Sequence, residues 1–118
     1  YLMDERIEKA FEVANYMATL SNQRRIILEE FDQKLTYYIN GGTFKITPEL
    51  ITFVKMNVDL GHLSEIPFID TNKFPIVIDD VQKFFDDITD IYFQAVNEYY
   101  IKYLDIKNKR NIKDIVSL

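Results

Sequence analysis

The sequence predicts a single domain, residues 1–118, that is mainly α, with three helices and a minor two-stranded β ribbon. The first and third helices are long and are expected to pack as a hairpin. Three observations support this fold class. Apolar residues recur at helical spacing over residues 4–39 and 79–107. Short β-prone segments lie at 43–46 and 74–78. The chain has 118 residues, 47% of them hydrophobic, which suits one domain with a core of its own.

Residues 4–39 are predicted to form one long helix. A helix with a heptad-like apolar stripe packs on a partner helix. The polar residues Ser21 and Arg24 interrupt the stripe, and Gly41-Gly42 is expected to end the helix because glycine accepts the left-handed cap. The residues of the stripe are Ile7, Ala10, Ala14, Met17, Leu28, Phe31, Leu35 and Tyr38.

A second helix is predicted over residues 48–60. Thr47 is a good N-cap, Pro48 suits the first helical turn, and Gly61 is a natural stop. Its buried face is expected to contain Leu50, Phe53, Val54 and Val58.

Two short strands flank this helix and are expected to pair with each other as a ribbon. The first spans residues 43–46 and the second 74–78, where Pro75 indicates an edge or the start of a strand. Residues 62–73 between them are predicted to be a loop. A two-stranded ribbon is marginal alone, so it should pack on the helices.

A third helix is predicted over residues 79–107, with Asp79 as its cap. It is expected to end near Asn108. Its apolar face consists of Val81, Phe85, Ile88, Tyr92, Ala95, Tyr99, Tyr103 and Ile106.

The composition excludes several classes of function. Cysteine is absent, so the chain has no disulfides, thiolate zinc sites or cysteine nucleophiles. The net charge of -5 makes general nucleic-acid binding unlikely, because that needs a basic face. No segment has the roughly 20 apolar residues that span a bilayer, and the first residues do not resemble a secretory signal.

The acidic residues Asp86, Asp87 and Asp90 form the strongest metal-site candidate. Paired carboxylates on a helix could hold a hard cation such as magnesium and support a metal-dependent enzyme. Acidic residues also belong near a helix N-terminus for electrostatic reasons alone, and no companion metal motif is present. His62 is the only histidine, and after the helix-ending Gly61 it suits a role at the helix end. We therefore predict no catalytic residue, no cofactor and no metal site.

A polar patch at Asn22, Gln23, Arg24 and Arg25 interrupts the first helix. Arginine suits contacts with phosphate, carboxylate or a protein partner. The patch could bind a partner or ligand, or fix helix register. It could equally be a solvated face whose arginines pair with Asp86, Asp87 or Asp90.

Basic residues gather at the end of the chain, where Lys109, Arg110 and Lys113 lie. Together with Arg24 and Arg25 they give an alternative function, an accessory nucleic-acid-binding protein. Basic residues at a helix C-terminus also complement the helix dipole, which explains them without a ligand.

Aromatic residues nearly surround the third helix, which indicates a homo-oligomer. One partner helix cannot cover both the 92-99-103 face and the 93-100 face. We expect Phe93, Tyr100 and Ile101 to remain uncovered in a monomer and to form an oligomer interface. Alternatively, residues 112–118 could fold back over the same strip.

Three segments resemble small uncharacterised proteins of T-even-like tailed phages that infect marine bacteria. They are Met3–Phe11, Ala14–Arg24 and Tyr38–Phe44. The resemblance assigns no activity and no catalytic residue. It implies a phage-encoded protein made in the bacterial cytoplasm, with virion association as one outcome. The leading prediction is thus a non-enzymatic protein-interaction module that forms a homo-oligomer.

Overall fold

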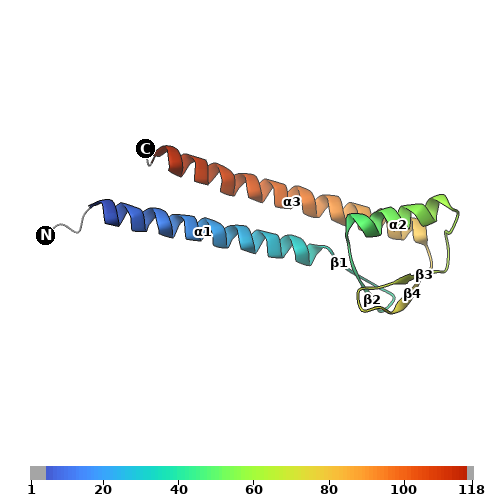
Figure 1. Ribbon diagram of the computed structural model, residues 1–118. Coiled ribbons are helices and arrows are strands. Elements are labelled where there is room, and N and C mark those ends of the chain that lie inside the picture. Colours follow the sequence, from blue (N-terminus) through green and yellow to red (C-terminus); the bar gives the residue numbers. More distant parts are fainter. Residues whose placement is uncertain (1–4, 117–118) are drawn as a thin grey trace. The chain divides into compact units, whose positions relative to one another are not determined.

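The computed structural model describes the backbone of residues 5–116 and the side chains of residues 5–109. The described chain has three helices and two antiparallel two-stranded ribbons, so the predicted mainly α fold class is confirmed (Figure 1). The elements are α1 Glu5–Lys34, β1 Thr36–Ile39, β2 Gly42–Lys45, α2 Pro48–Asp59, β3 Ile66–Ile69, β4 Pro75–Ile78 and α3 Val81–Val116.

The chain divides into two compact units. The hairpin unit comprises residues up to 30 together with residues from 99 onward, and contains most of α1 and the C-terminal part of α3. The core unit comprises residues 31–98, which include both ribbons, α2 and the start of α3. Each unit is described in turn.

The first helix ends earlier than predicted. Residues 36–39 form β1, which pairs with β2 in the register Thr36 with Lys45 and Ile39 with Gly42. Asn40 and Gly41 form the two-residue turn between them, with φ of 50° and 78°. Positive φ at both positions defines the hairpin turn that suits the twist of the strands. The four residues before this turn are β-branched or aromatic, and such residues favour a strand over a further turn of helix.

The predicted pairing of residues 43–46 with 74–78 is wrong. Residues 75–78 form β4, which pairs with β3 at 66–69, inside the segment that was expected to be a loop. The core unit therefore contains two ribbons, and each is formed by two strands that follow one another in the sequence.

The two ribbons are joined by the turn between β3 and β4. The Thr71 amide donates to the Thr43 carbonyl at 2.8 Å, and the Lys45 amide donates to the Thr71 hydroxyl oxygen at 3.1 Å. The Thr43 amide donates to the Asp70 carboxylate at 3.0 Å. The edge of β2 is thus paired with this turn, which satisfies backbone groups that an open edge would leave exposed.

The ends of α2 are as predicted. The Thr47 hydroxyl accepts from the Leu50 amide at 3.1 Å, and Pro48 occupies the first turn. At the other end Gly61 has φ of 82°. Its amide donates to the Val58 carbonyl, while the His62 amide donates to the Asn57 carbonyl at 2.9 Å. These two bonds satisfy the last carbonyls of the helix.

Both ends of α3 differ from the prediction. Asp80, not Asp79, is the cap, because its carboxylate accepts from the Lys83 amide at 3.0 Å. The helix continues to Val116 instead of ending near Asn108. Residues 112–116 extend α3, so the predicted fold-back of 112–118 is wrong over that range. Residues 117 and 118 lie outside the described part of the chain.

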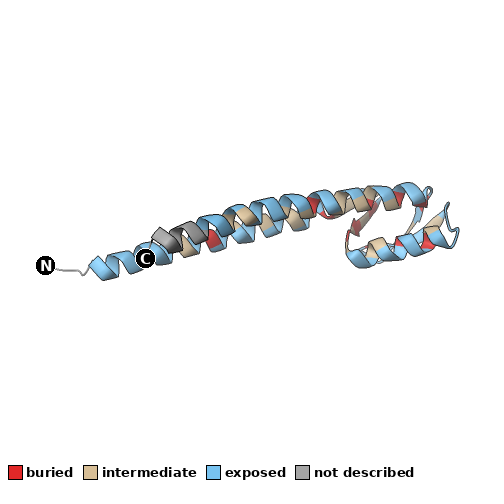
Figure 2. Cartoon of the chain, turned by 90° about the horizontal axis from the view of Figure 1, so that it is seen from above, coloured by how far each residue is buried: buried red, intermediate tan, exposed pale blue. Residues whose placement is uncertain are grey.

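Phe84 lies at the centre of the apolar core of the core unit. It is 1% exposed, and its ring lies 5.3 Å from Phe44, 5.6 Å from Phe68 and 5.9 Å from Tyr37, measured between ring centroids. Each ribbon therefore contributes an aromatic ring to the same cluster. Figure 2 shows the buried residues gathered where the ribbons, α2 and the first turns of α3 meet. The other buried apolar members are Leu35, Ile46, Val54, Ile78, Val81, Ile88 and Ala95.

Candidate functional site: the helical hairpin

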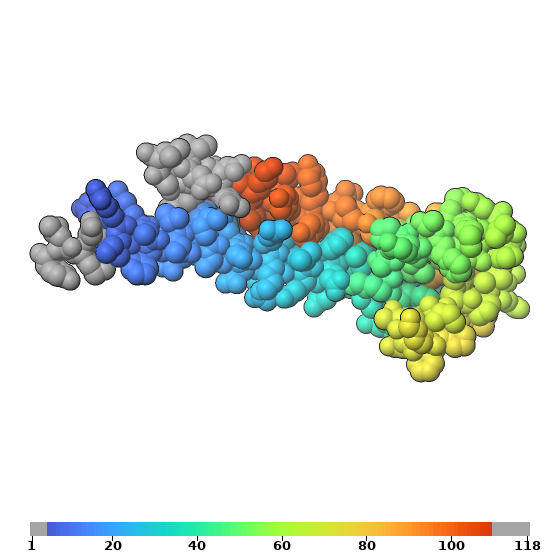
Figure 3. Space-filling view, in the orientation of Figure 1, coloured from blue at the N-terminus to red at the C-terminus, as the bar shows by residue number. Residues whose placement is uncertain are grey.

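In the hairpin unit, α1 and α3 run antiparallel. The Tyr16 hydroxyl donates to the Lys109 carbonyl at 2.7 Å, and the Lys102 ammonium lies 2.7 Å from the Glu30 carboxylate. The partner in α3 moves back from residue 109 to residue 102 as the residue in α1 advances from 16 to 30, which is the order of an antiparallel pair. In Figure 3 the blue surface of α1 and the orange surface of α3 meet along the unit.

Leu20, which is 6% exposed, is the only buried residue among the described side chains of the hairpin unit. Of the apolar stripe predicted for the first helix, Ile7 and Leu28 are exposed, whereas Leu35 is buried in the core unit. Large apolar side chains remain exposed on both helices: Ile7, Phe11, Val13, Ile26, Leu28, Tyr100, Ile101 and Tyr103. Among its described residues, the unit therefore has more large apolar side chains exposed than buried (Figure 2).

One groove lies beside the line along which α1 and α3 pack, and four of its eight lining residues are isoleucines; we call it the isoleucine groove. It has a volume of about 480 Å³. Ile26 is 45% exposed and Ile101 is 66% exposed, and they line the groove from opposite helices. The full set of lining residues is Gln23, Ile26, Ile27, Ile101, Lys102, Asp105, Ile106 and Lys109.

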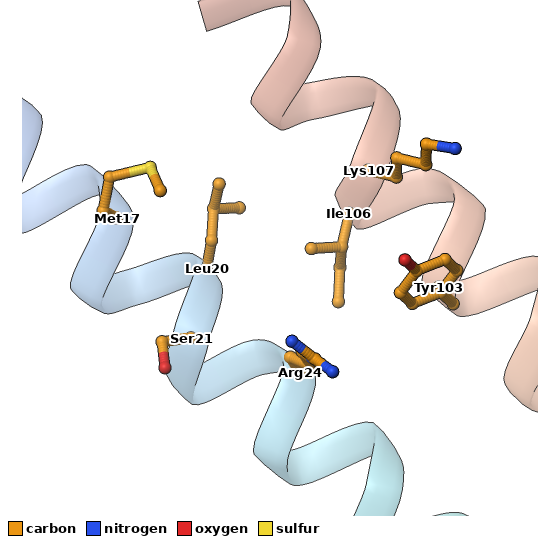
Figure 4. Close-up of a pocket in the computed structure, with 7 residues that line it drawn as sticks. All are labelled: Met17, Leu20, Ser21, Arg24, Tyr103, Ile106 and Lys107. Atoms are coloured by element: carbon orange, nitrogen blue, oxygen red, sulfur yellow. The ribbon is translucent and has the colours of Figure 1, made fainter.

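A second, smaller groove of about 280 Å³ is lined by residues of the same two helices, and we call it the arginine groove. Met17, Leu20 and Ile106 form its apolar part, and Figure 4 shows them directed toward one another from the two helices. Arg24 of α1 and Tyr103 of α3 also line the groove. Ser21 and Lys107 complete the lining, with their polar atoms directed away from it (Figure 4).

The structure separates the predicted patch at residues 22–25. Gln23 lines the isoleucine groove and Arg24 the arginine groove, since successive helical residues point about 100° apart. Arg25 pairs with Glu29 at 2.9 Å, within its own helix. Asn22 is exposed. Gln23 and Arg24 thus line different grooves, and whether residues of this patch bind a partner or ligand stays a prediction.

The residues of the predicted oligomer interface are all exposed. Tyr100 and Ile101 belong to the hairpin unit, and Ile101 lines the isoleucine groove. Phe93 belongs to the core unit, is 59% exposed, and its ring packs edge-on against Tyr92. Whether a second copy covers them stays a prediction.

Of the basic residues near the chain end, Lys109 pairs with Asp105 at 3.1 Å. The side chains of Arg110 and Lys113 lie outside the described residues. Among the described helices, none is long and apolar enough to cross a membrane.

The acidic residues of α3 take separate roles in the core unit. Asp87 accepts a hydrogen bond from the Tyr37 hydroxyl at 3.1 Å, and Asp86 accepts one from the Gln82 amide at 3.0 Å. Asp90 is exposed. Burial raises the pKa of Tyr37, and the hydrogen bond to Asp87 and its negative charge raise that pKa further. No group of three or more acidic, histidine or cysteine side chains is placed to hold a metal ion within the described residues.

His62 lies at the C-terminal end of α2, as its position after Gly61 suggested. Its Nδ1 lies 3.1 Å from the side-chain oxygen of Asn57, which is buried. This contact fixes the helix end and leaves His62 in a structural role.

Comparison with models of protein families, with curated proteins and with solved structures finds no match. The function must therefore be inferred from the geometry of the chain itself.

Sequence reasoning did not identify Leu20, Ile26 and Ile27 as the residues that shape the helical hairpin. The sequence did contain a signal for the face of α1 that packs on α3, because Leu20 and Ile27 are seven residues apart and lie on one helical face. The stripe through Ile7, Ala14 and Leu28 has a similar period, so the period alone did not identify which stripe of α1 packs on α3.

Proposed function

We propose that this protein is a non-enzymatic protein-interaction module that acts as a homo-oligomer through its helical hairpin. The observation that carries the proposal is that Leu20 is the only buried residue among the described side chains of the hairpin unit, while eight large apolar residues are exposed there. Following the resemblance to phage proteins, we place its activity in the cytoplasm of an infected bacterium.

The physical argument is that two helices alone bury too little surface. Helical stability in proteins comes mainly from packing an amphipathic face, because nucleation of a helix is costly. Each exposed isoleucine that becomes buried contributes roughly 1.5–3 kcal/mol. Contact with a second hairpin would bury part of this exposed apolar surface in the interior of a four-helix bundle.

The buried polar groups of the core unit support the non-enzymatic part of the proposal. Asp70 accepts backbone hydrogen bonds, and Asn57 bonds both its own helix and His62. Tyr37 and Asp87 hold a strand against α3. These side chains are engaged in holding local structure together, whereas a catalytic site needs groups aimed at a substrate.

Light scattering coupled to chromatography tests the oligomer. We expect a mass of at least twice the 14.0 kDa of one chain at tens of micromolar protein. The combined variant Ile7→Gln/Phe11→Gln/Ile26→Gln/Ile101→Gln should be smaller, because glutamine keeps helix propensity while it removes apolar surface. The control Ile69→Gln/Phe74→Gln changes exposed apolar residues of the core unit and should keep the wild-type mass.

A 14 kDa species for the wild type at these concentrations would refute the oligomer. Salt-sensitive micromolar binding of DNA, lost in Arg24→Ala/Arg25→Ala, would instead favour the nucleic-acid alternative.

A further inference from the structure

The geometry points to the isoleucine groove as the contact surface between two copies of the chain, arranged about a two-fold axis parallel to the helices. In this arrangement α1 of one copy lies on α3 of the other, and Ile26 contacts Ile101 of the second copy in both directions. The inference rests on the proposed function and specifies its partner and its surface.

The apolar content of the groove favours a protein surface as occupant. Four isoleucines line it, and the two outermost, Ile26 and Ile101, are about half or more exposed. The arginine groove is smaller, and Arg24 and Tyr103 are part of its lining. Burial against a helix therefore gains more at the isoleucine groove, whose exposed lining is the more apolar of the two.

The charges beside the groove favour a second copy over an acidic or basic partner. Lys102 already pairs with Glu30, and Asp105 already pairs with Lys109. A partner of one charge sign would have to break one of these pairs and leave the other residue unpaired. An identical surface carries both signs, so its charges can be matched in a two-fold contact.

The same charges determine which helix lies on which. On this side of the hairpin the acidic Glu30 belongs to α1, whereas α3 has two lysines, Lys102 and Lys109, and one carboxylate, Asp105. Stacking α1 on α1 would bring Glu30 toward glutamates of the second copy's α1. Stacking α1 on α3 brings it toward lysines instead, and makes every neighbouring helix antiparallel, as in an up-down bundle.

The two isoleucines lie close to each other along the hairpin, because both line the same groove from opposite helices. Rotation about an axis parallel to the helices keeps each residue at its level along the axis, and so brings Ile26 close to Ile101 of the second copy.

The size of the surface lies at the lower end of the range for standard dimer interfaces. With 1.5 Å of rise per residue and a helix width of about 10 Å, one face of the hairpin unit covers roughly 650 Å². A standard interface buries about 800 Å² per partner, and interdigitating side chains bury more than the projected face.

Cysteine cross-linking tests this arrangement cleanly because the chain has no cysteine of its own. A tagged Ile26→Cys chain is mixed with an untagged Ile101→Cys chain and treated with a mild thiol oxidant. We expect one dominant product, the tagged–untagged disulfide, because a disulfide needs Cα atoms about 4.4–6.8 Å apart. The matched control mixes Ser21→Cys with Lys107→Cys, which line the arginine groove, and should give little product.

Each other result overturns the inference. Efficient cross-linking of the control pair would place the contact on the arginine groove. A dominant product of Ile26→Cys with itself would place α1 on α1. If light scattering shows a dimer but the mixed disulfide does not form, the surface is wrong while the proposed function stands. If the wild type is monomeric, both fail.

Discussion

The backbone amide of Thr43 donates a hydrogen bond to the carboxylate of Asp70 at 3.0 Å, across the two ribbons of the core unit. The same carboxylate accepts from the amides of Asn72 at 3.0 Å and Phe74 at 2.9 Å. The bond from Thr43 lowers the pKa of Asp70 most, and the other two lower it further against the opposing effect of burial. One buried side chain thus closes the turn of one ribbon and holds that ribbon against the other.

The lowered pKa of Asp70 predicts a loss of stability in acid. A carboxyl whose folded pKa lies below its unfolded value stabilises the fold fully above about pH 4, and that contribution disappears as the pH falls through the folded pKa. In Asp70→Asn an amide group replaces an acceptor oxygen, so we expect a lower urea midpoint at pH 7. The difference from wild type should shrink as the pH is lowered below 4. A difference that stays constant over pH 2–7 would show that the Asp70 charge does not contribute.

Phe84→Ala should destabilise the core unit by about 3–5 kcal/mol, because it removes a ring packed on three others and leaves a cavity. Phe93→Ala is the matched control on the same helix. Its ring is mostly exposed and makes one edge contact with Tyr92, so the free energy of unfolding should change by only about 0.5 kcal/mol apart from the loss of that contact. Urea unfolding followed by circular dichroism measures both. Equal losses would contradict the assigned core.

Much of the fold was predictable because local signals agree with it. Thr47, Pro48 and Gly61 mark the ends of α2, and the structure uses all three as expected. The apolar face of α3 was also predictable, since Val81, Ile88 and Ala95 are buried.

The ribbons were mispredicted because the turn signal at residues 40–41 was interpreted as a helix end and a proline was interpreted as a sign of a loop. Asn40-Gly41 is a strong signal for a two-residue hairpin turn, and it predicts a strand on each side. Reading Gly41-Gly42 as a helix stop extended the first helix over β1. The strand β3 was missed for a related reason, since Pro67 suggested a loop although it occupies a strand of an isolated ribbon.

The proposed interaction surface was predictable only in part. Exposed Phe93, Tyr100 and Ile101 followed from the crowding of aromatic and apolar residues around α3. The groove itself depends on how α1 is rotated against α3. That rotation is set by contacts between distant residues, such as Tyr16 with Lys109, which periodicity does not encode.

Gly42 lies where the two ribbons approach each other. A Cβ atom added to it would come 2.5 Å from Cγ1 of Ile76. We therefore expect Gly42→Ala to destabilise the core unit by roughly 1–3 kcal/mol through overpacking. The double variant Gly42→Ala/Ile76→Ala should cost less than the sum of the two single changes, because Ile76→Ala removes the clash. Strictly additive losses in urea unfolding would mean that the two residues do not meet.

The last prediction concerns hydrogen exchange in the hairpin unit and its dependence on concentration. Regions with few buried apolar contacts open with little free energy, and the hairpin unit buries one described side chain while the core unit buries ten apolar residues. In dilute protein, amides of residues 7–20 should exchange much faster than amides of residues 84–95. If a second copy covers the hairpin, raising the concentration should slow exchange in 7–20, because association stabilises the folded form by mass action. The amides of 84–95 should change much less.

The variant Ile26→Gln/Ile101→Gln separates this effect from helix propensity. Glutamine is a good helix former, so an isolated helix should keep its intrinsic stability. We expect the variant to lose the concentration dependence of exchange in 7–20 and to retain wild-type protection in 84–95. Ile69→Gln should behave as wild type in both segments, since Ile69 is an exposed residue of the core unit. Exchange in 7–20 that is slow at every concentration in the wild type and in the variant would mean that the hairpin is stable alone, and the physical reason for self-association would be lost.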